Sequence, residues 1–317
     1  MKVIEWNKKY VSELVDLWNT ELGNEYPMRE ELFLQNSFQD KNLLKEGSFI
    51  GLEEDRLIGF VISKRWQETL DVAMSTEVGW IQACVIHNDF QDQGVGTALL
   101  KRAEVALWES GVTKIHMGSD PWHYFPGVPT TCEKAHYWMS KNNYQKGVTE
   151  YDLLNDGKGV FTYPSHFENV EFKLLNLNHK QELVDFLHKN FPGRWEYEAL
   201  HYFNRKGTGR EFIVATKNDK IIGFCRINDS LSPFIAQNVY WSPLFEKALG
   251  GIGPLGVTAQ ERGNGYGDGL VQAAIYFLRD RGIQNIVIDW TGLVDFYKKF
   301  HFEPWKLYVS YSKEREE

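Results

Sequence analysis

Residues 85–103 read VIHNDFQDQGVGTALLKRA, and residues 256–274 read GVTAQERGNGYGDGLVQAA. Each segment joins the end of an apolar strand to a glycine-rich turn and then to an amphipathic helix. The N-terminus of a helix leaves backbone N–H groups unpaired and carries partial positive charge, and glycine lets an anion approach the backbone closely. A single copy would more simply be a turn that begins a helix, but two copies in the same context favour a pair of pyrophosphate sites.

Other short matches indicate that the whole chain is a tandem repeat. The pairs are ELVDLW (13–18) with ELVDFL (182–187), LIGF (57–60) with IIGF (221–224), and QDQGVG (91–96) with RGNGYG (262–267), at offsets of 169, 164 and 171 residues. Their common order and similar offset indicate two copies of one domain. A turn-rich stretch at 155–159 marks the boundary, and we expect an N-terminal domain at 1–156 and a C-terminal domain at 167–317.

The predicted elements follow the same order in both halves. A strand and an amphipathic helix come first, followed by a hairpin (49–63 and 212–227), an apolar strand (81–86 and 254–257), the glycine-rich turn, a helix, a further strand, and a final helix and strand that close each half. Because strands and helices mix without strict alternation, the pattern predicts the α+β (mixed α/β) class. We expect two tandem domains, each with a mixed central sheet flanked by helices.

Composition excludes several classes of function. The chain has 317 residues and a formal charge of −8, so it lacks the basic face with which proteins neutralise nucleic acid. Cys84, Cys132 and Cys225 fit neither a zinc motif nor a disulfide framework, and no H-E-x-x-H pattern occurs, so we expect no metal. No run of 18 apolar residues and no signal-peptide pattern occurs. We therefore expect a cytoplasmic protein without a membrane segment.

The glycine-rich segments resemble the GNAT N-acetyltransferase superfamily, whose pattern is a strand, then Q/R-x-x-G-x-G/A, then a helix. Two sets of residues match it, Gln91 with Gly94 and Gly96, and Arg262 with Gly265 and Gly267, so the resemblance covers essentially the whole chain. It implies acetyl-CoA as the acyl donor, with its pyrophosphate on the turn and its pantetheine beside the preceding strand. The residues that it places along acetyl-CoA are Cys84, Ile86, Gln91, Asp92, Gln93, Gly94, Val95, Gly96 and Thr97, and Leu255, Val257, Arg262, Gly263, Asn264, Gly265, Tyr266, Gly267 and Asp268.

A second element of the family has the form Tyr-x-x-x-Gly-Phe, and the C-terminal half contains DFYKKFHFEPW (295–305). Tyr297 stands at the tyrosine position, Phe302 matches the phenylalanine, and His301 replaces the glycine. The resemblance therefore implies that Tyr297 protonates the departing CoA thiolate. In the N-terminal half, aligning Asn143-Tyr144 with His301-Phe302 puts Met139 at the tyrosine position, and methionine cannot donate a proton. The C-terminal half is accordingly the favoured catalytic half.

The expected reaction is transfer of an acetyl group from acetyl-CoA to a primary amine by direct attack through a tetrahedral intermediate. The alternative is a non-catalytic sensor or scaffold that binds acyl-CoA. The acceptor is expected to be a small-molecule amine. The general base is not identified by the sequence, in which Asp289 and Asp295 flank the candidate acid. Either a monomer with pseudo-dimeric halves or a homodimer fits the repeat.

Two further segments each allow more than one interpretation. DPWHYFPGVPTT (120–131) makes the N-terminal half longer, and it either caps a substrate cleft or forms a surface loop. Residues 251–256 read GIGPLG and match the dinucleotide fingerprint G-x-G-x-x-G formally. That fingerprint should follow a strand and open a helix, whereas here a proline lies inside it and a strand-like segment follows, so we reject dinucleotide binding.

Overall fold

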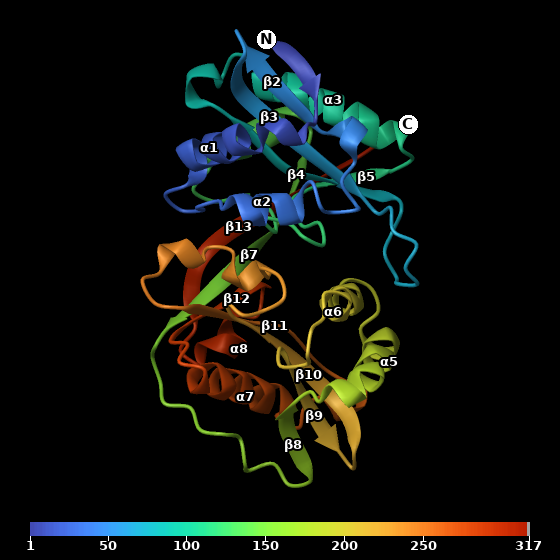
Figure 1. Ribbon diagram of the computed structural model, residues 1–317, viewed down its shortest axis with the longest axis vertical. Helices are drawn as coiled ribbons and strands as arrows, with labels where there is room; N and C mark the ends of the chain where they lie inside the picture. The colour runs from blue at the N-terminus through green and yellow to red at the C-terminus, as the bar shows by residue number, and fades with distance from the viewer. Residues whose placement is uncertain (316–317) are drawn as a thin grey trace. The chain divides into compact units, whose positions relative to one another are not determined.

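The computed structural model describes residues 1–315, which fall into two compact units. The first unit comprises Met1–Leu70, Ser75–Glu150 and Leu307–Glu317, and the second comprises Asp71–Met74 and Tyr151–Lys306. Each unit contains one copy of the repeat, and the helices and strands of both are labelled in Figure 1.

The first unit is built on a sheet in which β1 to β5 lie side by side in chain order and the end of β13 adds to β5. The strands are β1 (Lys2–Glu5), β2 (Phe49–Glu53), β3 (Arg56–Arg65), β4 (Val78–Ile86), β5 (Lys114–Met117) and the short β6 (Val128–Pro129), and the helices are α1 (Val11–Leu22), α2 (Glu30–Asn36), α3 (Val95–Glu109) and α4 (Glu133–Lys141). The β4–β5 pair is parallel and the other pairs of this sheet are antiparallel.

Helices cover both faces of the first sheet because neighbouring residues of a strand point to opposite faces. On β3, the ring of Phe60 lies 6.0 Å from the ring of Phe33 in α2. The next residue, Val61, is buried in the cluster that contains Leu99 and Leu100 of α3. The central strands are therefore apolar on both sides.

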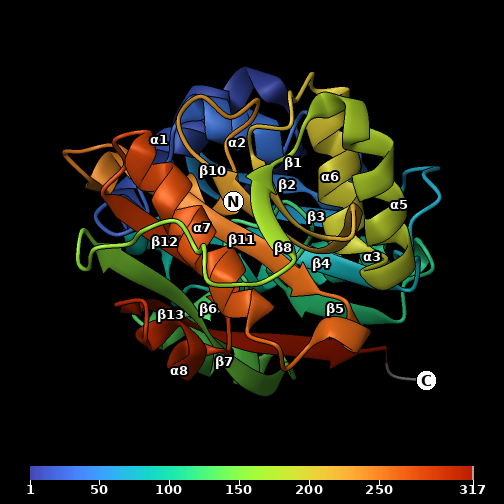
Figure 2. The ribbon, with the colours of Figure 1, turned by 90° about the horizontal axis from the view of Figure 1, so that it is seen from below.

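The second unit repeats this plan with β8 to β12 and the end of β7. Its strands are β8 (Val170–Leu174), β9 (Phe212–Lys217), β10 (Lys220–Asn228), β11 (Leu249–Val257), β12 (Asn285–Thr291) and part of β7 (Gln145–Asp156), and its helices are α5 (Lys180–Asn190), α6 (Arg194–Asn204), α7 (Tyr266–Asp280) and α8 (Val294–Lys298). Figures 1 and 2 show α7 on one face of these strands and α5 and α6 on the other. The mixed sheet flanked by helices confirms the predicted fold class.

The structure differs from the expected domain limits in the strands that close each sheet. Residues 151–156 of β7 belong to the second unit, where Leu153 pairs with Ile288 of β12. The C-terminal strand β13 (Glu303–Glu314) does the reverse, since its Ser312 pairs with His116 of β5 in the first unit. Part of the last strand of each half therefore belongs to the other unit. The sequence pattern places these strands but does not specify their partners, because an alternating strand suits either sheet edge equally well.

Residues 1–315 contain neither a helix that could cross a membrane nor a cluster of metal-ligating side chains. None of the helices described is long and apolar enough to cross a membrane. Within the same residues, no group of three or more His, Cys, Asp or Glu side chains is arranged to hold a metal ion.

Candidate active site

Both glycine-rich turns have the backbone conformation that glycine favours. Gly94, with φ of 82°, immediately precedes α3, and Gly265, with φ of 78°, immediately precedes α7. Residues with a side chain rarely adopt this left-handed conformation. The predicted residues 91–97 and 262–268 thus form the turn and the first turn of each helix, where N–H groups point outward along the helix axis.

In the second unit, β11 runs beside β12 for only part of its length and so makes a fork. The parallel pairing extends from Leu249 with Asn285 to Ile252 with Ile288, and β11 then continues to Val257 along β10 alone. Thr258 donates its N–H to the carbonyl of Ile222 at 2.9 Å. Because hydrogen-bonded pairs alternate along an antiparallel ladder, the backbone groups of Leu255 and Val257 point away from β10 and into the fork.

The first unit has the same fork between β4 and β5. Parallel pairing ends at Ile81 with Met117, and β4 continues beside β3 to Ile86. His87 donates its N–H to Ile58 at 2.9 Å, so by the same alternation Cys84 and Ile86 turn their backbone groups into the fork. The four strand residues expected along pantetheine are therefore the ones whose backbone groups face these two forks.

The motif side chains Gln91 and Arg262 fix the turns to the fork strands. Gln91 Nε2 donates to the carbonyl of Ile86 at 3.0 Å, and Arg262 Nε donates to the carbonyl of Val257 at 3.2 Å. These equivalent bonds explain why the first position of the family pattern is Gln or Arg, a long side chain with an N–H donor.

The turn of the first unit has more carboxylates than cations around it. Glu21 accepts a hydrogen bond from the N–H of Asn88 at 2.9 Å, and so places a carboxylate against the turn. Asp92 pairs with Lys134 at 3.2 Å, and Asp89 lies 4.0 Å from Arg56. Three carboxylates against two cations disfavour a bound pyrophosphate.

The turn of the second unit has the opposite balance. Glu261 pairs with Lys217 at 3.0 Å, and Asp268 pairs with Lys299 at 2.6 Å. Arg262 adds a third cation, whose Nε bonds only to a neutral backbone carbonyl. Three cations against two carboxylates suit an anionic ligand at the N-terminus of α7.

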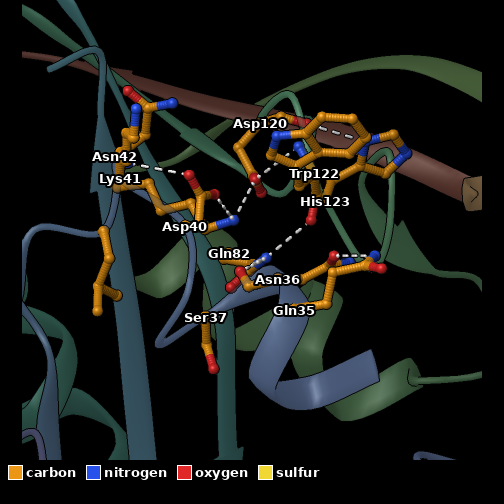
Figure 3. Close-up of polar contacts among 12 residues, drawn as sticks. Gln35, Asn36, Ser37, Asp40, Lys41, Asn42, Gln82, Asp120, Trp122 and His123 are labelled. Carbon is orange, nitrogen blue, oxygen red and sulfur yellow. Dashed lines mark hydrogen bonds and ion pairs between the residues drawn. The ribbon is translucent and has the colours of Figure 1, made fainter. Parts of the chain in front are cut away.

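The segment that follows β5 in the first unit is bonded to both β4 and β3. Figure 3 shows Gln82 of β4 pointing into this segment, where its Nε2 donates to the carbonyl of Trp122 at 2.9 Å. The Lys64 ammonium lies 2.7 Å from both Asp40 Oδ2 and Asp120 Oδ1, and all three side chains are at most 1% exposed. A buried Asp–Lys–Asp triad thus ties the segment to β3.

The structure contradicts the surface loop, one of the two expectations for residues 120–131, and leaves the cap over a substrate cleft a prediction. Trp122, His123, Tyr124 and Phe125 are all buried, so this part is not a surface loop. Tyr124 and Phe125 pack on Trp18 of α1, with ring centroids 5.0 and 5.5 Å apart. The aromatic residues therefore act as core of the first unit.

Equivalent positions of the two forks, counted from the turn glycines, carry different residues. Gln82 and Gly253 each lie twelve residues before their turn glycine, and the strand registers make Gly118 of the first unit equivalent to Asp289 of the second. A Cβ at Gly118 would collide with the carbonyl of Phe125. In the second unit the glycine is on β11, as Gly253, and the larger residue is on β12, as Asp289. Asp289 Oδ1 lies 3.9 Å from the position that a Cβ on Gly253 would occupy.

Asp289 is partly exposed and lies beside a buried polar cluster. Glu198 of α6 accepts hydrogen bonds from Arg194 Nε at 2.7 Å and from Arg226 at 3.4 Å, so its charge is balanced. Asp289 accepts a hydrogen bond from the side chain of Asn238. Burial raises the pKa of Asp289 to about 6, with Arg194 opposing the rise and Glu198 adding to it.

Tyr297 lies in α8, buried at 7% exposure, with its ring against Phe296 and Phe302. Burial raises the pKa of its phenol, and Cys225 and Asp289 raise it further, so the hydroxyl keeps its proton at neutral pH. The equivalence of Tyr297 and Met139 follows from their neighbours. The Phe296 ring lies 3.6 Å from the Cβ position of Gly267, and the Trp138 ring lies 3.4 Å from that of Gly96.

Sequence reasoning missed most of the buried polar residues. Lys64, Asp40, Gln82, Glu198 and Arg226 come from separate parts of the chain, and only the fold brings them together. One available signal was a charged residue inside an apolar strand pattern, since Lys64 ends FVISK and Arg226 interrupts GFCRI.

Comparison with known proteins gives the class. A model of the acetyltransferase (GNAT) family matches residues 10–124 and again residues 180–302, and the chain therefore belongs to this family. A curated relative, an uncharacterized N-acetyltransferase of Methanocaldococcus jannaschii, is 30% identical over 131 residues, which are 39% of this chain and 58% of the relative. The match thus spans less than two thirds of that relative.

Solved structures share the tandem fold. The GCN5-related glucosamine N-acetyltransferase region of a fungal multi-domain GH3 β-N-acetylglucosaminidase has a TM-score of 0.87 at 24% identity, over 98% of this chain and 38% of that one. A GCN5-related N-acetyltransferase from Sphaerobacter thermophilus has a TM-score of 0.76 at 14% identity, over 99% and 95% of the two chains. A tandem GNAT protein from the clavulanic acid biosynthesis pathway has a TM-score of 0.69 at 12% identity, over 99% and 98%. The tandem two-domain arrangement is thereby confirmed.

Proposed function

We propose that this protein moves an acetyl group from acetyl-CoA to a primary amine of a small molecule, by direct attack through a tetrahedral intermediate, and that the second unit performs the reaction. The observation that carries this assignment is the contrast between the two forks. In the second unit, a turn with an excess of cations and a buried tyrosine accompany a fork that holds Asp289 opposite Gly253. The first unit has an excess of carboxylates at its turn and Met139 at the tyrosine position.

The residues proposed to hold acetyl-CoA are those of the second turn and fork strand. The N–H groups of residues 263–268 receive the pyrophosphate at the start of α7. The backbone groups of Leu255 and Val257, which face the fork, receive the pantetheine amides and the carbonyl oxygen of the thioester. Tyr297 gives a proton to sulfur as the carbon–sulfur bond breaks. Acetyl-CoA itself supplies the activated acyl group.

The first unit is proposed to be non-catalytic. Gln82 of its fork strand bonds to Trp122, the Lys64 triad ties the same segment to β3, and its Cys84 is no nucleophile, because burial raises the pKa of this thiol to about 12. Gln91, Asp92 and the glycines of its turn keep the family geometry without the favourable charge.

Calorimetric titration with acetyl-CoA tests which unit binds. Gly94→Trp and Gly265→Trp are a matched pair, since both glycines precede a helix at φ near 80°. We expect Gly265→Trp to weaken binding at least 100-fold and Gly94→Trp to leave it unchanged. Loss of binding in Gly94→Trp alone would reverse the assignment of the units, and a wild-type protein that does not bind acetyl-CoA would refute the proposed function.

The acceptor is tested by release of the CoA thiol with a panel of amines. Glucosamine is the first to try, because the structural neighbour with the TM-score of 0.87 is described as a glucosamine N-acetyltransferase region. Spermidine and a lysine-containing peptide complete the panel. Transfer to glucosamine and not to the peptide would support a small-molecule acceptor, whereas transfer to the peptide alone would contradict it.

A further inference from the structure

The position of Asp289 in the fold separates it from the other carboxylates of the second unit. It follows Ile288, the last β12 residue to pair with β11, and so stands where the two strands part. Gly253, which faces it, has no side chain, and this leaves the carboxylate beside the strand that leads to Leu255 and Val257. The fork thus brings Asp289 to the strand along which the acyl donor is proposed to lie.

The groups around Asp289 leave it able to exchange a proton. Arg194 and Glu198 face it from α6, Tyr297 from α8 and Arg226 from β10, while Asn238 donates a hydrogen bond to it. Glu198 has two arginine partners of its own. Asp289 accepts a hydrogen bond from the neutral side chain of Asn238, and its pKa is raised to about 6 by burial. A base with a pKa near the operating pH combines the right protonation state with a useful affinity for protons.

We propose that the Asp289 carboxylate is the general base of the second unit, which takes the proton from the acceptor amine before attack. The inference rests on the proposed function and adds the residue that the sequence did not identify. The same carboxylate, being anionic, also selects a cationic acceptor, so the substrate class is an amine that arrives as an ammonium ion.

The proton balance uses both proposed groups. The acceptor ammonium gives one proton to Asp289, which becomes a neutral carboxylic acid and later releases that proton to solvent. The amine lone pair then forms the carbon–nitrogen bond at the thioester carbon. As the carbon–sulfur bond breaks, Tyr297 gives its proton to sulfur and receives the second proton of the nitrogen. The products are the amide, the CoA thiol and one proton.

The test is the pH dependence of kcat/KM for Asp289→Asn, measured by thiol release with glucosamine, spermidine and the lysine peptide, and with water alone as acceptor. In the wild type, kcat/KM should rise with pH through about 6 and then level off if Asp289 must be ionised. Asp289→Asn should lower the plateau about 100-fold or more, in line with a general base, and should abolish the rise. Asp289→Glu should restore part of the rate and the rise.

Two further measurements make the outcomes distinct. Calorimetry should give Asp289→Asn the same affinity for acetyl-CoA as the wild type, which shows that the variant is folded and holds the donor. Asp295→Asn is the matched control, because Asp295 is exposed and only two residues from Tyr297, and its pH profile should equal that of the wild type. An unchanged profile in Asp289→Asn would overturn the inference while the proposed function stands. A wild type that neither binds acetyl-CoA nor releases thiol would overturn both.

Discussion

Replacing Lys64 with methionine tests how much the buried triad stabilises the first unit. The Lys64 ammonium lies 2.7 Å from one oxygen of Asp40 and 2.7 Å from one oxygen of Asp120, with all three side chains at most 1% exposed. With lysine, the triad carries one net negative charge. With methionine, it carries two, and both carboxylates lose the Lys64 ammonium.

The expected cost follows from the burial of the pair. Removing one partner of a buried ion pair costs roughly 3–5 kcal/mol, because the remaining charge is left uncompensated. For a unit of this size, each kcal/mol lowers Tm by about 2–4 °C. We therefore expect the thermal transition of the first unit to fall by roughly 6–20 °C in Lys64→Met.

Differential scanning calorimetry with a surface control gives the measurement. Lys134→Met removes the partner of Asp92 in a pair whose side chains are 76% and 80% exposed, and such a pair contributes about 0–1 kcal/mol. Lys134→Met should therefore lower Tm by about 4 °C at most. If the transition of Lys64→Met falls by no more than that of Lys134→Met, the triad does not hold the 119–125 segment in place.

Two further predictions concern the chemistry of single side chains. Tyr297→Phe should lower kcat about 100-fold, as expected for loss of a general acid, while the Kd for acetyl-CoA measured by calorimetry stays the same; an unchanged kcat would remove Tyr297 from the mechanism. At pH 8, Cys84 should react with a disulfide reagent roughly 1,000-fold more slowly than an unperturbed thiol, because burial raises its pKa to about 12 from an ordinary value of about 8.5. The pKa of Cys132 and of Cys225 is also raised by burial, so all three thiols should react slowly in the native protein. Rapid release of the coloured product of the disulfide reagent before urea is added would contradict the prediction for Cys84.

The local pattern of the sequence predicts what depends on local structure. The turns at Gly94 and Gly265 and the strands before them were found because glycine conformation, strand alternation and helix starts are properties of neighbouring residues. The repeat also allowed the two halves to be aligned, so that Met139 could be matched with Tyr297 before their surroundings were known. The predicted backbone roles of Cys84, Ile86, Leu255 and Val257 agree with the direction of their backbone groups, although acetyl-CoA binding by them remains a prediction.

Other features could not be predicted because they depend on contacts between distant residues. Glu198 faces Arg226 across 28 positions of the chain, and Lys64 faces Asp120 across 56. The sequence alone gave no reason to prefer Asp289 over Asp295 as a base, since the two differ in position: Asp289 is partly buried where β11 and β12 part, and Asp295 is exposed on α8. The aromatic run 122–125 was ambiguous for the same reason, because its composition suits both a cap over a substrate cleft and a surface loop.

The exchanged closing strands limit how this protein can be divided. A fragment cut at the repeat boundary, such as 167–317, would lack the β7 residues that pair with β12, and would retain β13 residues whose partner β5 is missing. Both changes expose unpaired strand edges, which promote aggregation and intermolecular strand pairing. Two such fragments, 1–156 and 167–317, should instead complement one another when expressed together. The two copies therefore depend on each other's closing strands, and truncation of one copy is expected to destabilise the other.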